Sequence, residues 1–61
     1  MSATLARIKE ELRSAELRGL YDVIIDGERW LRDQRCWVKQ YSWLHDPHRI
    51  VTLKELGIGS A

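Results

Sequence analysis

The first pattern in the chain is a stripe of apolar residues at helical spacing. Apolar side chains recur every three or four positions, which places them on one face of an α-helix. They are Leu5, Ile8, Leu12 and Ala15. Gly19 then stands where a left-handed residue closes a helix, because glycine adopts positive φ without steric penalty. The pattern predicts an N-terminal amphipathic helix over residues 3–18.

The next segment has the composition of two strands joined by a tight turn. Residues 23–25 are Val-Ile-Ile, and β-branched side chains favour strands. Asp26-Gly27 follows, a pair that suits a type I′ turn because both central residues of that turn need positive φ. We therefore predict a β-hairpin at Asp26-Gly27 that pairs residues 21–25 with residues 28–32.

Residues 33–44 are compatible with two secondary structures. On a helix, one face would gather the apolar side chains of Trp37, Val38, Tyr41 and Leu44. On a strand that begins at Arg35, strict alternation would place five residues on one face. These are Arg35, Trp37, Lys39, Tyr41 and Trp43. The periodicity slightly favours the helix, so we predict a second helix over 33–44 with a third strand as the alternative.

The last quarter of the chain predicts a short strand and a helical turn. Pro47 interrupts the preceding element, because proline has no N–H and restricts the residue before it. Residues 49–52 then have strand composition. Thr52 and Glu55 have the spacing of a capping box, and Gly57 ends the turn. Together these elements predict one small α+β domain over residues 1–61.

Size and composition limit what this domain can do. Ten Lys and Arg residues stand against nine Asp and Glu residues, so the chain has no strongly basic arm. The isoelectric point of about 7.9 is below the value above about 9 expected for a duplex-DNA-binding domain. No apolar run approaches roughly 18 residues, so we expect no membrane span, and we expect no signal peptide.

The single cysteine, Cys36, excludes an intrachain disulfide and fits a reducing cytoplasmic setting. A chain of about 60 residues buries only about 60% of the surface that its unfolded form exposes. We therefore expect a homodimer to supply further burial.

Residues that could carry catalysis or bind a metal form no convincing pattern. Cys36, His45 and His48 lack both the spacing and the fourth ligand of a common zinc site. No nucleophile–base pair and no glycine-rich phosphate loop is present in the sequence. We expect a protein that is not an enzyme and that uses no metal or cofactor.

Residues 28–44 hold all three tryptophans among several cations, a composition typical of binding hot spots. Trp30 and Trp37 fit a core position whether the segment is a helix or a strand. Trp43 lies among cations in both cases, so it is the best candidate for partner contact. The predicted contact surface consists of Trp43, Tyr41, Lys39, Arg35 and Arg32.

This surface predicts a small interaction protein, an inhibitor or adaptor that docks on a protein partner. Aromatic and cationic residues also bind nucleic acid, so a dimeric nucleic-acid-binding transcriptional regulator is the main alternative. A small structural assembly subunit is the second alternative.

Overall fold

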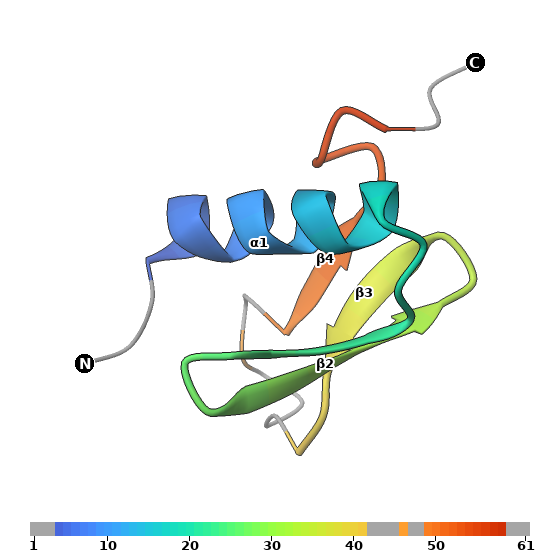
Figure 1. The fold of residues 1–61 in the computed structure, drawn as a ribbon. Helices are drawn as coiled ribbons and strands as arrows, with labels where there is room; N and C mark the ends of the chain where they lie inside the picture. Colours follow the sequence, from blue (N-terminus) through green and yellow to red (C-terminus); the bar gives the residue numbers. More distant parts are fainter. Residues whose placement is uncertain (1–3, 42–45, 47–48, 59–61) are drawn as a thin grey trace.

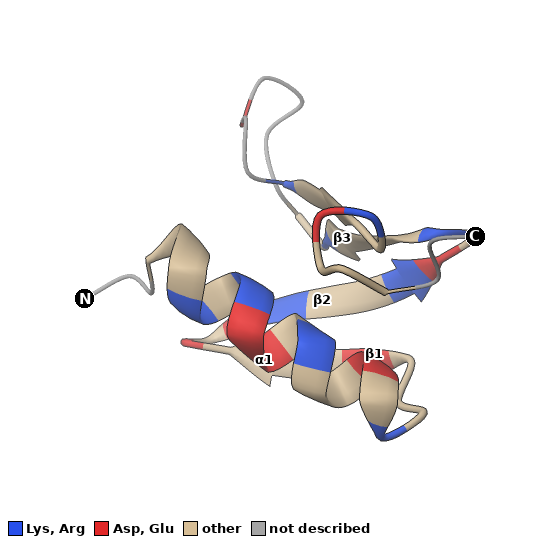
Figure 2. Ribbon diagram, turned by 90° about the horizontal axis from the view of Figure 1, so that it is seen from above, with Lys and Arg blue, Asp and Glu red and all other residues tan. Residues whose placement is uncertain are grey.

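The computed structural model describes residues 4–41, 46 and 49–58 of the chain (Figure 1). In this part, one helix precedes a four-stranded antiparallel sheet with strand order β1-β2-β3-β4. The elements are α1 (Leu5–Leu17), β1 (Asp22–Ile25), β2 (Glu28–Asp33), β3 (Cys36–Lys39) and β4 (Ile50–Thr52). Helix α1 lies across one face of the sheet, which confirms the predicted α+β class (Figures 1 and 2). Among the described residues, no helix has the length and apolarity that crossing a membrane requires.

Both ends of α1 are fixed by hydrogen bonds, and the sequence indicates the one at the C-terminus. At the N-terminus, Thr4 Oγ1 accepts a hydrogen bond of 3.3 Å from the backbone N–H three residues later. At the C-terminus, Gly19 has a φ of 73°. The backbone N–H of Leu20 donates to the carbonyl oxygen of Ala15 at 3.0 Å, as in a Schellman motif. The predicted N-terminal helix is thus confirmed, with slightly shorter bounds.

The predicted hairpin is confirmed as well. Asp26 has a φ of 52° and Gly27 a φ of 80°, so both central residues of the turn are left-handed. Beyond this turn, Ile25 pairs with Glu28, and the antiparallel register runs back to the pair of Asp22 with Leu31. The turn therefore sets the register of the first two strands.

For residues 33–41, the described part of the segment 33–44, the predicted helix is wrong and the alternative of a third strand is right. Residues 36–39 form β3, which pairs with β2 on one side and with β4 on the other. A tight turn at Gln34, which has a φ of 51°, reverses the chain before β3. In a strand, alternation directs Trp37 to the same face of the sheet as Trp30. Pairing with two neighbouring strands therefore outweighs the local helical periodicity.

The chain after β4 closes into the predicted capping box. The N–H of Thr52 donates to Glu55 Oε2 at 3.3 Å, and the N–H of Glu55 donates to Thr52 Oγ1 at 3.2 Å. Gly57 then ends the turn with a φ of 73°. Leu56, between Glu55 and Gly57, is buried, so the turn adds an apolar side chain to the core.

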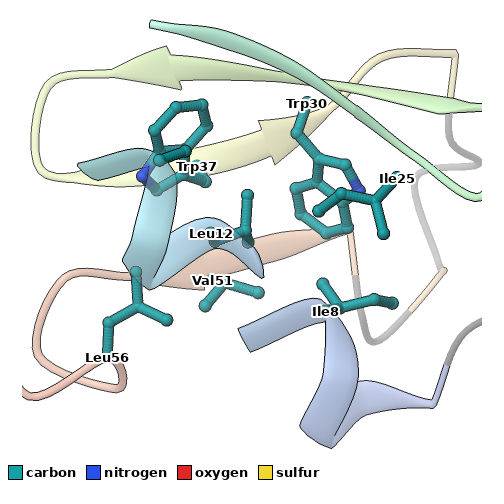
Figure 3. Packing of buried hydrophobic residues seen from close by; sticks show 8 residues of the cluster. Ile8, Leu12, Ile25, Trp30, Trp37, Val51 and Leu56 are labelled. Atoms are coloured by element: carbon teal, nitrogen blue, oxygen red, sulfur yellow. The ribbon is translucent and has the colours of Figure 1, made fainter. Parts of the chain in front are cut away.

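The core lies between α1, the sheet and this terminal turn (Figure 3). It consists of Ile8, Leu12, Ala15, Ile25, Trp30, Trp37, Val51 and Leu56. Trp30 and Trp37 are both 0% exposed, which confirms their predicted role in the core. In Figure 3 the two indoles project from the sheet on either side of Leu12.

The two buried indoles differ in their hydrogen bonding, which leads to a testable difference in stability. Trp37 Nε1 donates to Glu16 Oε1 at 3.2 Å, whereas Trp30 Nε1 is buried without a hydrogen-bond partner among the described residues. A hydrogen bond to a charged group contributes about 1.5–3 kcal/mol, and a buried unpaired donor costs about 1–3 kcal/mol. We expect Trp37→Phe to destabilise the fold by about 2 kcal/mol more than Trp30→Phe. Urea unfolding followed by circular dichroism measures this difference, and equal losses would contradict it.

Candidate interaction surface

The structure divides the predicted contact residues between different parts of the molecule. In the strand register, Lys39 lies opposite Trp30, and Arg32 lies opposite Trp37. Paired residues of neighbouring strands project from the same face. Arg32 and Lys39 therefore project from the face of the sheet that α1 covers, where both take part in ion pairs.

Arg32 joins β2 to α1. Its Nε lies 2.7 Å from Glu16 Oε1, and its Nη2 lies 3.3 Å from Glu16 Oε2. The Arg32 side chain is only 16% exposed. The hydrogen bond from Arg32 lowers the pKa of Glu16, partly opposed by burial, and the same bond raises the pKa of Arg32. The guanidinium is thus occupied by a carboxylate of its own chain.

Lys39 is held in a similar way at the other end of the covered face. Its Nζ lies 3.0 Å from Asp46 Oδ2 and 3.4 Å from Glu28 Oε2. It also lies 5.8 Å from the centroid of the Trp30 ring, and its side chain is 12% exposed. Burial acts to lower the pKa of Lys39, but hydrogen bonds with Asp46 and Glu28 raise it above its ordinary value. This ammonium is therefore already neutralised within the fold.

The other predicted contact residues lie elsewhere. Arg35 is exposed in the turn before β3. Tyr41, which follows β3, is 93% exposed and has a φ of 63°. Trp43 lies outside the described residues. Arg35 and Tyr41 thus stand beyond opposite ends of one strand, and the described part of the predicted surface does not form one continuous cluster.

The face of the sheet away from α1 carries aliphatic side chains that cross neighbouring strands. Leu31 of β2 lies opposite Val38 of β3, which lies opposite Ile50 of β4. Ile24 of β1 projects from the same face, because Val23 beside it pairs with Trp30 on the covered face. We call the face formed by Ile24, Leu31, Val38 and Ile50 the outer face.

The exposure of these side chains shows that the outer face is open. Ile24 is 71% exposed and Ile50 is 42% exposed, while Leu31 and Val38 are half-buried. These aliphatic side chains do not belong to the core cluster. Both views place α1 on the opposite face, so no other described element packs on the outer face (Figures 1 and 2).

Polar groups also project from the outer face and balance each other in charge, because Asp22 is the partner of Leu31 in the register and Arg29 is the partner of Ile24. Arg29 Nε lies 3.0 Å from each carboxylate oxygen of Asp22, and this hydrogen bond lowers the pKa of Asp22 despite some opposing desolvation. The N–H of Gln40 donates to the carbonyl oxygen of Arg29 at 2.8 Å, which brings the start of the Tyr41 segment beside this pair. Over β1 and β2 the outer face therefore carries a neutral ion pair beside its aliphatic side chains.

Cys36 also projects from the outer face. It is half-buried, and its Sγ lies 3.2 Å from the carbonyl oxygen of Asp33. His45 and His48, which the sequence offered as possible metal ligands with it, lie outside the described residues. Among the residues that are described, no cluster of three His, Cys, Asp or Glu side chains could hold a metal ion.

Sequence reasoning did not identify the outer face, although part of the signal was present. Under the strand alternative for 33–44, alternation separates Cys36 and Val38 from Trp37 and Lys39. The partners of Val38 depend on the register with β2 and β4, and that register appears only in the folded chain. Comparison of the chain with protein-family models, curated proteins and solved structures finds no match.

Proposed function

We propose that this chain is a non-enzymatic interaction protein, an inhibitor or adaptor, that docks on a protein partner through its outer face. The observation that carries the proposal is the aliphatic surface of Ile24, Leu31, Val38 and Ile50, which no other described element covers. Burial of apolar surface stabilises a complex by about 25 cal/mol per Å² before the costs of association. A partner with a matching apolar surface gains that stabilisation.

The ion pairs of Arg32 and Lys39 favour a protein partner over nucleic acid. Nucleic-acid affinity arises largely when Lys and Arg side chains neutralise phosphates. Arg32 is paired with Glu16, and Lys39 is paired with Glu28 and Asp46. A phosphate would have to compete with these carboxylates for both cations. The transcriptional-regulator alternative therefore loses two of its proposed phosphate contacts.

The exposed members of the predicted contact set keep a role in this proposal. Tyr41 and Arg35 flank β3, the strand at the centre of the aliphatic surface, and both are exposed. Polar and amphipathic residues at the rim of an interface exclude water from its apolar centre. We propose Tyr41 and Arg35 as rim contacts and keep Trp43 as a proposed contact from the neighbouring segment.

The proposal also concerns the oligomeric state of the chain and the cellular compartment in which it acts. The outer face of a second copy offers the same aliphatic side chains, so a homodimer would compete with the partner for this surface. The lone Cys36 fits a reducing compartment, so we propose that the protein acts in the cytoplasm.

The proposal is tested by capture experiments with two matched lysine variants. Val38→Lys places a charge in the centre of the outer face, whereas Leu17→Lys places one on α1, where Leu17 is already 69% exposed. Partners captured from the native host by the wild-type chain are identified and then titrated with each variant. We expect Val38→Lys to weaken binding at least about tenfold, equivalent to about 1.4 kcal/mol, and Leu17→Lys to leave it within about twofold.

The salt dependence of the affinity distinguishes a protein partner from a nucleic-acid partner. An apolar protein interface changes little in affinity between about 50 and 200 mM salt, whereas a complex with many phosphate contacts loses about 10³–10⁵ in affinity. Partner binding that Val38→Lys leaves unchanged in a folded protein would reject the outer face as the docking surface. A steep loss of affinity with salt would instead favour the nucleic-acid alternative.

A further inference from the structure

The two edges of the sheet differ in how their backbone groups are satisfied. At the β4 edge, the capping-box turn occupies both backbone groups of Thr52. Its N–H donates to Glu55, and its carbonyl oxygen accepts a hydrogen bond of 3.3 Å from the N–H of Leu56. The terminal turn therefore closes this end of β4 to further strand pairing.

The β1 edge has no such closure. The N–H of Arg32 donates to the carbonyl oxygen of Tyr21 at 2.9 Å, which makes these two residues a hydrogen-bonded pair. Hydrogen-bonded and non-hydrogen-bonded pairs alternate along an antiparallel ladder. Val23 and Ile25 therefore bond to β2, whereas the backbone groups of Asp22 and Ile24 point away from it. Among the described residues, these outward groups have no backbone partner.

Exposed apolar side chains accompany this open edge. Tyr21 is 74% exposed and Ile24 is 71% exposed, in contrast to Ile25, which is 3% exposed. Exposed edge strands pair readily with other strands, and proteins commonly protect them with proline, inward-pointing charge or a bulge. The sequence of β1, Asp-Val-Ile-Ile, has neither proline nor lysine, and its register with β2 is uninterrupted. The edge thus offers unpaired backbone groups beside an exposed aliphatic side chain.

The position of α1 determines what can occupy this edge. Helix α1 contacts β1 and crosses over it on the covered face of the sheet (Figures 1 and 2). In a symmetric pairing of β1 with the β1 of a second copy, the two strands would lie about 4.8 Å apart. Each helix, about 10–12 Å in diameter with its side chains, would then cross over its own β1 on the same side. The two helices would collide, so a lone extended segment fits where a second copy does not.

We propose that β1 binds an extended segment of a partner protein, which adds to the sheet as an antiparallel fifth strand. The segment would exchange backbone hydrogen bonds with Ile24 and Asp22, a recognition mode known as β-augmentation. A β-branched aliphatic side chain suits the position opposite Ile24 on the outer face. A small side chain suits the position opposite Val23, which projects towards α1. The inference rests on the proposed function, because it names the kind of protein segment that is bound.

The test uses a defined peptide, acetyl-Lys-Thr-Val-Ala-Thr-Lys-amide, in which Val, Ala and the second Thr would lie opposite Ile24, Val23 and Asp22. The control peptide carries N-methyl groups on Val and on the second Thr, which removes the donors that would reach the carbonyl oxygens of Ile24 and Asp22. Titrations are followed by ¹⁵N–¹H NMR of the full chain. We expect a dissociation constant on the order of 1 mM, with the largest shifts at the amides of β1, and at least about tenfold weaker binding of the control.

Variants of β1 test the same hydrogen bonds by changing the protein instead of the peptide. Ile24→Pro removes an N–H that points away from β2, so the β1–β2 pairing is retained, and Ile24→Val is the matched control that keeps this donor. We expect Ile24→Pro to weaken peptide binding at least about tenfold and Ile24→Val to leave it within about threefold. If Ile24→Pro does not fold, the comparison of the two peptides on the wild-type chain decides the question.

The outcomes separate this inference from the proposed function. Absence of binding at about 10 mM peptide, equal binding of the methylated control, or shifts centred away from β1 would overturn the β1 site. Those results leave the Val38→Lys capture experiment unaffected. Conversely, peptide binding at β1 together with full partner capture by Val38→Lys supports the β1 site and rejects the outer face.

Discussion

Leu12→Ala is expected to destabilise the protein by about 3–4 kcal/mol, the largest effect of any single replacement considered for this chain. Leu12 is 0% exposed and lies on the face of α1 that packs on the sheet (Figure 3). Truncation removes buried methyl groups and leaves a cavity that the two rigid indoles nearby cannot fill. A chain of this length has a total stability of roughly 3–9 kcal/mol, at about 0.05–0.15 kcal/mol per residue. This variant is therefore expected to lose at least about a third of the total stability.

The control for this prediction lies on the same helix. Leu17→Ala removes the same atoms, but Leu17 is 69% exposed, so little apolar surface is returned to water. Any gain from the helix propensity of alanine is common to both replacements. We expect Leu17→Ala to change the unfolding free energy by less than about 0.5 kcal/mol. Thermal and urea unfolding measure both variants, and similar losses would contradict the assignment of the packed face of α1.

Elements defined by local interactions could be predicted from the sequence. The helix end at Gly19, the left-handed turn at Asp26-Gly27 and the reciprocal bonds of Thr52 with Glu55 each depend on residues a few positions apart. Local propensity and hydrogen bonding are then sufficient to choose the conformation. The bounds of α1 and of the first hairpin follow from the same local signals.

The helix predicted for 33–44 is wrong at residues 36–39 because their conformation depends on distant residues. The periodicity of the segment fits an amphipathic helix, but Trp37 lies opposite Val51 in β4, and the side chain of Trp37 bonds to Glu16 in α1. Neither contact can be read from the segment itself. Tertiary pairing commonly overrides a weak local preference, and strand propensity depends strongly on such neighbours.

The predicted contact surface shows the same limit of prediction from local sequence. Arg32 and Lys39 were predicted to contact a partner because a run of aromatic and cationic residues is typical of binding hot spots. The structure places the carboxylate of Glu16 against Arg32 from a helix sixteen positions earlier in the chain. It also places Lys39 between Glu28 and Asp46. Because these partners are remote in sequence, the loss of both cations from the contact surface required the folded structure.

Glu16→Ala is expected to destabilise the protein by about 2 kcal/mol at neutral pH. The Glu16 carboxylate accepts hydrogen bonds from Arg32 of β2 and from the buried indole of Trp37 in β3, so it ties α1 to two strands. Its side chain is 20% exposed, which reduces the screening of this pair by solvent. Glu10→Ala, at an exposed glutamate of the same helix, is the control and should change the unfolding free energy by less than about 0.5 kcal/mol.

The contribution of Glu16 should also depend on pH in a defined direction. Its pKa is lowered in the folded state, chiefly by the hydrogen bond from Arg32, whereas the unfolded chain has the ordinary value of about 4.3. A group of this kind stabilises the fold fully above its unfolded pKa and loses that contribution as the pH falls through its folded pKa. The isosteric variant Glu16→Gln isolates this term. Its deficit in unfolding free energy relative to wild type should be constant above about pH 6, and should shrink as the pH falls below about 4.3. A deficit that stays constant down to about pH 2 would show that the charge of Glu16 does not stabilise the contact between α1 and the sheet.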